Sequence, residues 1–263
     1  RETAWMRPGS RLGRISDSVS RNVDRGHPDV ALFEIGQVFA GEEPSDQTTA
    51  AGGVRQGRSA PGATGRHWSH GGEPAGVFDV KADLLAMIAA IGGPVGNLEA
   101  TRDAPAYYHP GRSGVLRLGP KVLATFGELH PAVLSAMDAP ERLVAFELTI
   151  EAVPEPRRKA IRKGAFHALH LMPVRRDFAF LVDEATDARA ITRAAKGARK
   201  DLVTDVVVFD VYRGQGVPEG QKSVAVEAVL QPTEKTLTDK EIDAVSEAIV
   251  AAVGKATGAT LRG

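Results

Sequence analysis

The feature that most constrains this chain is the alternation of strand and helix patterns over residues 173–263. Runs of β-branched and aromatic residues bounded by turn residues predict strands, and apolar residues at helical spacing predict helices. The predicted elements, in chain order, are a strand at 175–182, a helix at 186–196, strands at 201–212 and 222–231, a helix between Thr238 and Gly258, and a short strand at 259–261. The patterns of this segment therefore predict one sheet with two helices.

The two helices have start and stop signals. Thr238 is followed three residues later by Glu241, which is the spacing of a capping box, and Gly258 suits a left-handed C-cap. Thr186 is the predicted cap of the first helix. The order βαββαβ is that of a ferredoxin-like unit, in which helices cover one face of the sheet and the other face stays open.

Alternation along each strand predicts which side chains lie on the open face. Toward the helices we expect Phe178, Phe180 and Val182, then Val207, Phe209 and Val211, then Val224, Val226, Ala228 and Leu230. Outward we expect Arg175, Asp177, Ala179 and Leu181, then Val208, Asp210 and Tyr212, then Ser223, Ala225 and Glu227. The outward set is small and polar at its middle and includes one tyrosine.

Such a face suits single-stranded RNA, because small residues let a base approach the sheet and a tyrosine ring offers a surface for stacking. Aspartate can accept hydrogen bonds from base amino groups, and cations at the rim can reach phosphates. The candidate RNA-binding residues are Arg175, Arg176, Asp210, Tyr212, Arg213, Lys222, Ser223 and Ala225. The alternative is an ordinary solvated face, or one covered by another domain.

Composition limits the other classes of function. The chain has 33 Lys+Arg and 33 Asp+Glu, so its net charge gives no general attraction to nucleic acid or anionic membranes. Cysteine is absent, which excludes disulfides and thiolate zinc sites. No apolar run approaches the roughly 20 residues of a membrane span, and no signal peptide is visible. We expect a cytoplasmic protein with no membrane or DNA partner and, because Arg1 is not Met, a segment of a longer chain.

The first half of the chain also mixes strands and helices. Strands are predicted at 30–39, 114–118, 121–128 and 143–150, and helices at 15–23, 80–91 and near 131–137. The Gly-rich stretch from 41 to 76 is interpreted as mostly loop, with one short strand near 51–54. The fold class is therefore α+β, with a domain boundary in the basic connector that contains Arg157, Arg158, Lys159, Arg162 and Lys163. That cluster can touch phosphates, or it can be a solvated linker.

The histidines raise two further possibilities, a metal site and a catalytic site. The pairs His67/His70 and His167/His170 have the i, i+3 spacing of metal ligands on a helix, but no carboxylate supports either pair at a recognisable spacing. His109 and His130 lie in turn-like motifs, and no Ser or Cys nucleophile sits in a recognisable elbow. We expect them to hydrogen-bond tight turns, and a hydrolase that uses them is the disfavoured alternative.

Several strings together resemble the beta chain of bacterial phenylalanyl-tRNA synthetases, in the family's order. They are Arg21–Gly26, Leu32–Phe39, Phe78–Asp83, Tyr108–Ser113, Gly127–Pro131, Arg175–Asp183, Val208–Gly214, Lys235–Asp239 and Gly258–Gly263. The resemblance implies a degenerate, non-catalytic class II synthetase-like domain with an antiparallel sheet at 1–153, a basic linker at 154–172, and a ferredoxin-fold anticodon-binding domain at 173–263.

The resemblance also implies partners and cofactors. The family's alpha chain activates phenylalanine with ATP and Mg and charges tRNA(Phe), while the beta chain supports it and holds the tRNA. For this segment we expect the alpha chain and tRNA(Phe) as partners and no cofactor of its own. Class II sites clamp ATP with an Arg on the sheet and a second Arg after a Gly-rich strand, and the sequence patterns predict no such Gly-rich strand followed by Arg within residues 1–165. The alternative function is a free-standing regulatory or metabolite-binding module.

Overall fold

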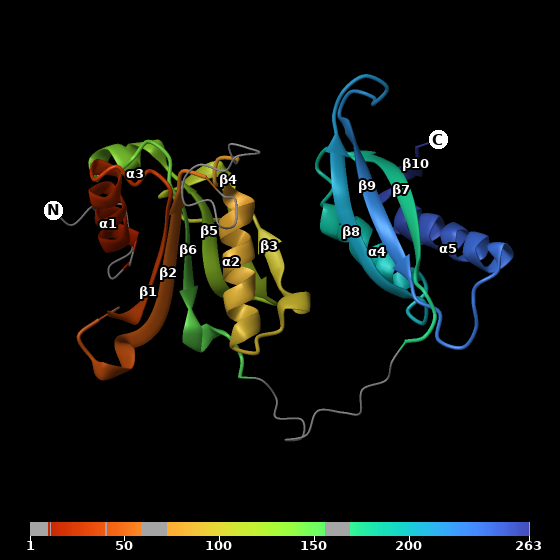
Figure 1. Cartoon of the computed structure of the whole chain (residues 1–263), viewed down its shortest axis with the longest axis horizontal. Coiled ribbons are helices and arrows are strands. Elements are labelled where there is room, and N and C mark those ends of the chain that lie inside the picture. Colours follow the sequence, from red (N-terminus) through yellow and green to blue (C-terminus); the bar gives the residue numbers. More distant parts are fainter. Residues whose placement is uncertain (1–9, 11, 40, 59–72, 156–168, 263) are drawn as a thin grey trace. The chain divides into compact units, whose positions relative to one another are not determined.

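The computed structural model describes residues 10, 12–39, 41–58, 73–155 and 169–262. The chain divides into two compact units, Arg1–Ile161 and Arg162–Gly263, which are described separately (Figure 1). The basic cluster from Arg157 to Lys163 and the histidines His67, His70 and His167 lie outside the described residues.

The first unit is built on a six-stranded antiparallel sheet with the order β1-β2-β6-β5-β4-β3. Its strands are β1 Val30–Phe39, β2 Gln47–Gln56, β3 Glu99–Thr101, β4 Tyr108–Leu118, β5 Lys121–Leu129 and β6 Val144–Thr149. Three 3-10 turns are interspersed at Pro44–Asp46, Val95–Asn97 and Ile150–Ala152. The expected α+β fold with an antiparallel sheet is confirmed, and β3 is the strand that the sequence patterns missed.

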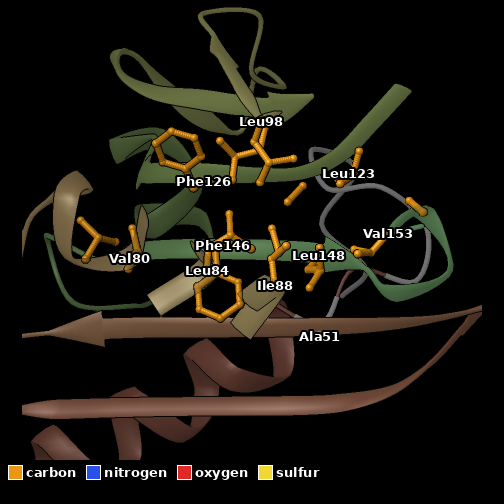
Figure 2. Packing of buried hydrophobic residues seen from close by; sticks show 14 of the residues in the cluster. Ala51, Val80, Leu84, Ile88, Leu98, Leu123, Phe126, Phe146, Leu148 and Val153 are labelled. Atoms are coloured by element: carbon orange, nitrogen blue, oxygen red, sulfur yellow. The ribbon is translucent and has the colours of Figure 1, made fainter. Parts of the chain in front are cut away.

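Three helices cover this sheet on both faces: α1 Leu12–Asp24, α2 Val77–Ala90 and α3 Pro131–Ala136. In α2, Val80, Leu84 and Ile88 recur at helical spacing and are fully buried against the sheet. Figure 2 shows this core, with Phe146 and Leu148 of β6 beside the helix. The neighbouring Ala145 points to the other face, where it joins a second core with α1 and α3.

The Gly-rich segment contains more strand than predicted. The short strand expected near 51–54 is part of the ten-residue strand β2, which pairs with β1 on one side and β6 on the other. The ring of Phe146 explains the small residues there. A Cβ built on Gly53 would lie 2.4 Å from that ring, so glycine makes room for a large aromatic on the adjacent strand. Glycine in this strand therefore reflects close packing.

The second unit contains β7 Val174–Asp183, α4 Ala188–Ala198, β8 Val203–Tyr212, β9 Gln221–Leu230, α5 Asp239–Thr257 and β10 Thr260–Leu261. The sheet order β10-β7-β9-β8, antiparallel throughout, confirms the ferredoxin-like arrangement. Helices α4 and α5 share one core with the inward side chains of the sheet. Ile249 of α5 packs there with Phe180 of β7 and Val224 of β9. The opposite side of this sheet, away from α4 and α5, is called the open face below.

The helix caps follow their predictions in one case and differ in the other. Thr238 and Glu241 form the expected capping box of α5, and Gly258 ends it with a φ of 70°. The cap of α4 is Asp187 rather than Thr186, and its side chain makes no capping hydrogen bond. The backbone N–H of Thr186 is instead bonded to the carbonyl of Asp183, so Thr186 lies in the preceding turn.

The capping box predicts a pH dependence. A hydrogen bond from Lys235, followed by one from the Thr238 backbone N–H, lowers the pKa of Glu241 from 4.5 to about 2. A depressed folded-state pKa stabilises the fold above the unfolded pKa, and that stabilisation is lost as the pH falls from about 4.5 toward about 2. We expect Glu241→Gln to destabilise the chain at pH 7 but not near pH 2.

The measurement is the free energy of unfolding of both proteins across this pH range, at low and high salt. Because Glu241 is exposed, the difference should be modest and smaller at high salt. A difference that stays constant between pH 7 and pH 2 would contradict the assignment.

Candidate nucleic-acid interface

The strand β8 controls the open face, and a bulge in it changes the predicted alternation. Val208 pairs with Val226, but the next pair is Asp210 with Ala225, so Phe209 is an extra residue without its own partner. Val206 and Val208 pack against the helices, whereas Val207 is exposed and Phe209 is 59% exposed. The predictions for Val207, Val208 and Phe209 are therefore wrong, because the bulge reverses the parity of the strand before it.

Beyond the bulge the expected parity returns. Asp210 lies opposite Ala225, which lies opposite Ala179 of β7. One row further on, Tyr212 lies opposite Ser223, which lies opposite Leu181. On β7 and β9 the inward residues are buried as predicted, so the alternation is confirmed for these two strands.

The structure therefore brings Asp210, Tyr212, Ser223 and Ala225 together on the open face. Ser223 is buried despite this position, between the larger neighbours Leu181 and Tyr212 of its row. The exposed side chains of Val207 and Phe209 make the face more apolar than the sequence predicted. Phe209 is thus a further aromatic on or beside this face, and only the bulge shows it.

The predicted rim cations are arranged differently from the expectation. Lys222 is only 7% exposed and shares the parity of the buried Val224, and its Nζ donates to the Glu184 carbonyl at 2.8 Å. Arg176 lies opposite the buried Ala228, which puts it on the helix side of the sheet. Arg175 lies on the open face but forms an ion pair with Glu227. Lys222 and Arg176 are therefore not on the face for which they were predicted.

Glu184 also engages Arg213. The guanidinium donates to both carboxylate oxygens, with Nη2 to Oε1 at 2.7 Å and Nε to Oε1 at 3.0 Å. Hydrogen bonding to Glu184 raises the pKa of Arg213 above its ordinary value. The side chains of Arg213 and Glu184 are both exposed, so a phosphate can reach the pair. To bind Arg213, the phosphate must replace the Glu184 carboxylate.

Tyr212 has a neighbour that the sequence analysis did not include. The Cζ of Arg262 lies 5.4 Å from the Tyr212 ring centroid, within the range of a cation–π contact. The Tyr212 hydroxyl donates to the Gln215 carbonyl at 3.3 Å. The sequence shows Arg262 only as a cation next to the last predicted strand. It does not show the contact with Tyr212, because the two residues are fifty positions apart.

The histidine alternatives are resolved by their hydrogen bonds. Nδ1 of His109 accepts from the Gly111 N–H at 3.1 Å, and Nδ1 of His130 accepts from the Ala132 N–H at 3.2 Å and caps α3. The turn-stabilising role is therefore confirmed for both. Within the described part of the chain, no group of three or more His, Asp or Glu is placed to hold a metal ion, and no helix is long and apolar enough to cross a membrane.

Comparison with known proteins identifies the family of both units. Residues 1–150 match the model described as "Phenylalanyl tRNA synthetase beta chain CLM domain", and residues 171–262 match "Ferredoxin-fold anticodon binding domain". The chain belongs to the phenylalanyl-tRNA synthetase beta-chain family. This confirms the resemblance drawn from the sequence strings and does not favour the alternative of a free-standing regulatory module.

Individual relatives from this family match the chain over a limited part of their own length. The phenylalanine--tRNA ligase beta subunit of Rhodopseudomonas palustris is 50% identical over 98% of this chain, and that of Rhodospirillum rubrum is 48% identical over 98%. The chain spans 32% of the length of each. Among solved structures, a pyrrolysyl tRNA synthetase from Desulfitobacterium hafniense is 13% identical, with a TM-score of 0.37 over 56% of this chain and 47% of that one.

The bulge in this beta-chain segment predicts opposite outcomes for two adjacent substitutions. We expect Val208→Asn to destabilise the chain by about 1–3 kcal/mol, because a polar amide replaces a side chain that packs on the core. Phe209→Asn should change stability by less than about 1 kcal/mol, because its side chain is exposed. Thermal unfolding of the two variants checks this, and the reverse order would mean that the strand has no bulge.

Proposed function

We propose that this chain is the C-terminal part of the beta subunit of phenylalanine--tRNA ligase and that its open face binds the anticodon region of tRNA(Phe) in the cytoplasm. Support comes from the family of the second unit together with the geometry of its sheet. In this proposal the chain contributes to ATP- and Mg-dependent aminoacylation through its partners, and the catalytic groups belong to the alpha chain.

The observation that carries the proposal is the pair of cross-strand rows on the open face. Ala179 and Ala225 leave space above the sheet, with Asp210 at the end of their row. Tyr212, which is 40% exposed, stands at the end of the next row. A base that approaches this part of the sheet can stack on the exposed part of the Tyr212 ring and present its amino group to Asp210.

The cations of this region suggest that stacking contributes more to binding than phosphate contacts do. Arg175 and Arg213 are engaged by Glu227 and Glu184, and Lys222 is buried. Participation of Arg175 and Arg213 in tRNA binding stays part of the proposal and requires exchange of their present carboxylate partners. We therefore expect a shallow dependence of affinity on salt, since few phosphates are neutralised.

The test is Tyr212→Ala. Stacking of one base on an aromatic side chain contributes about 1–3 kcal/mol, so affinity for tRNA(Phe) should fall about tenfold or more. Tyr212→Phe is the matched control, because it keeps the ring and removes only the hydrogen bond to Gln215. Titration of labelled tRNA with each variant measures the effect.

A second substitution separates stacking from general damage. Ala225→Trp should also weaken binding, because it fills the space above the sheet while the Tyr212 side chain itself is kept. Loss of thermal stability with unchanged tRNA affinity in Tyr212→Ala would show that this tyrosine has a structural role only.

The first unit offers a surface for the proposed alpha-chain partner. Phe33, Ile35 and Phe39 are exposed and share one parity along β1, which is an edge strand of the sheet. They lie on the same face as α2, since Ile35 pairs with Ala51 of that core. An exposed apolar row on an edge strand is typical of a protein interface. We place the alpha chain there, and we propose that this domain is non-catalytic.

We expect Phe33→Ser combined with Ile35→Ser to reduce co-purification with the alpha chain by about tenfold or more, since both side chains would lose burial in the interface. Leu169→Ser is the control, because it removes an equally exposed apolar side chain from the second unit. Equal recovery of the alpha chain with all three proteins would exclude this edge as the interface.

A further inference from the structure

The C-terminal residues place an arginine on the open face of the second unit. β10 pairs with β7, with Thr260 opposite Leu181 and Leu261 opposite Phe180. The next residue, Arg262, donates its backbone N–H to the Ala179 carbonyl at 2.7 Å. Because Ala179 faces outward, alternation puts the Arg262 side chain on the same open face.

From that anchor the guanidinium reaches the end of β8. Its Cζ is 5.4 Å from the Tyr212 ring centroid. Four residues occupy the intervening positions of the two rows. Ala179, Ala225 and Ser223 are small, and Leu181 is the larger one. The arginine and the tyrosine thus meet above a part of the sheet where Leu181 is the only large intervening side chain.

The hairpin between β8 and β9 fits around this pair. Gly214 leaves room for the tyrosine, since a Cβ there would lie 2.7 Å from the Tyr212 hydroxyl oxygen. Gly216 has a φ of 85°, and a Cβ there would lie 3.3 Å from Nη2 of Arg262. The turn therefore has glycine at the two positions where it approaches the ring and the guanidinium.

Charge distinguishes Arg262 from the other cations of the open face. Arg175 is paired with Glu227, and Arg213 is paired with Glu184. Arg262 has no carboxylate partner among the residues that the structure describes, and its nearest aromatic neighbour is the proposed stacking residue. An unpaired guanidinium beside an exposed ring can both orient that ring and attract a phosphate or base.

We propose that Arg262 is a positioning residue for RNA binding: it holds the Tyr212 ring in the orientation in which a single-stranded base stacks on it. This inference rests on the proposed function of the open face and adds the residue that holds the stacking ring of Tyr212 in place before RNA binds. A ring fixed before binding loses less conformational freedom when the base arrives, which favours affinity.

The experiment uses the whole chain and the anticodon stem–loop of tRNA(Phe) as the probe. We expect Arg262→Ala to weaken binding about three- to tenfold, in keeping with the loss of one cation–π contact and its preorganisation. Arg262→Lys should recover less than half of this loss, because it keeps the charge but not the planar group. Arg193→Ala, on the exposed side of α4, removes one positive charge from the opposite side of the sheet and should leave affinity within about twofold.

A double-mutant cycle with Tyr212→Ala tests the positioning role. If Arg262 acts through the ring, Arg262→Ala should weaken binding by less than about twofold once Tyr212 is alanine. Fully multiplicative effects would mean that Arg262 contacts RNA independently and would overturn the positioning role. In the free chain, the Arg262 side-chain proton resonances should be shifted upfield by the ring current of Tyr212 and should move downfield in Tyr212→Leu.

The outcomes separate the two proposals. If Tyr212→Ala weakens binding while Arg262→Ala matches Arg193→Ala, the role of Arg262 is wrong and the RNA-binding face stands. If the wild-type chain does not bind the stem–loop, both the RNA-binding face and the role of Arg262 are wrong. Absence of the ring-current shift in the free chain would overturn the positioning role whatever the RNA measurements give.

Discussion

One-sided burial of the sheet in the second unit is the constraint on which its surface chemistry depends. Helices α4 and α5, through residues such as Ile249, bury Phe180 and Val224 of the sheet in a single core on one face. A sheet residue that joins this core is an apolar anchor, and its neighbours in the strand must point the other way. The open face is thus specified by the packing behind it. Any shift in strand register changes which side chains it displays.

The bulge at Val208–Asp210 shows how this dependence works. Val206 and Val208 satisfy the core, and the extra residue Phe209 then resets the strand so that Asp210 and Tyr212 face outward. Without the bulge, Asp210 and Tyr212 would take the parity of Val208 and turn toward the helices. The local irregularity therefore reconciles an apolar core with polar and aromatic groups on the other side.

The first unit uses its sheet differently, since helices cover both of its faces and strand β2 lies within it. Gly53 beside Phe146 and the fully buried Leu84 and Ile88 show a closely packed interior. Its exposed apolar row is confined to the edge strand β1. The proposal made above correspondingly assigns association with the alpha chain to the first unit and RNA contact to the second.

The sequence by itself determined the order of elements, the ferredoxin-like topology, the α5 cap and the family, because these depend on local periodicity, cap chemistry and short strings. It also placed Asp210, Tyr212, Ser223 and Ala225 together correctly, since beyond the bulge the strand returns to the predicted parity. Only the tertiary structure decided the exposure of Phe209, the burial of Lys222, the pairing of Arg213 with Glu184, and the approach of Arg262 to Tyr212. The physical reason is that a bulge, an ion pair and a contact between distant strands are set by packing across the sheet, which no pattern along a single strand records.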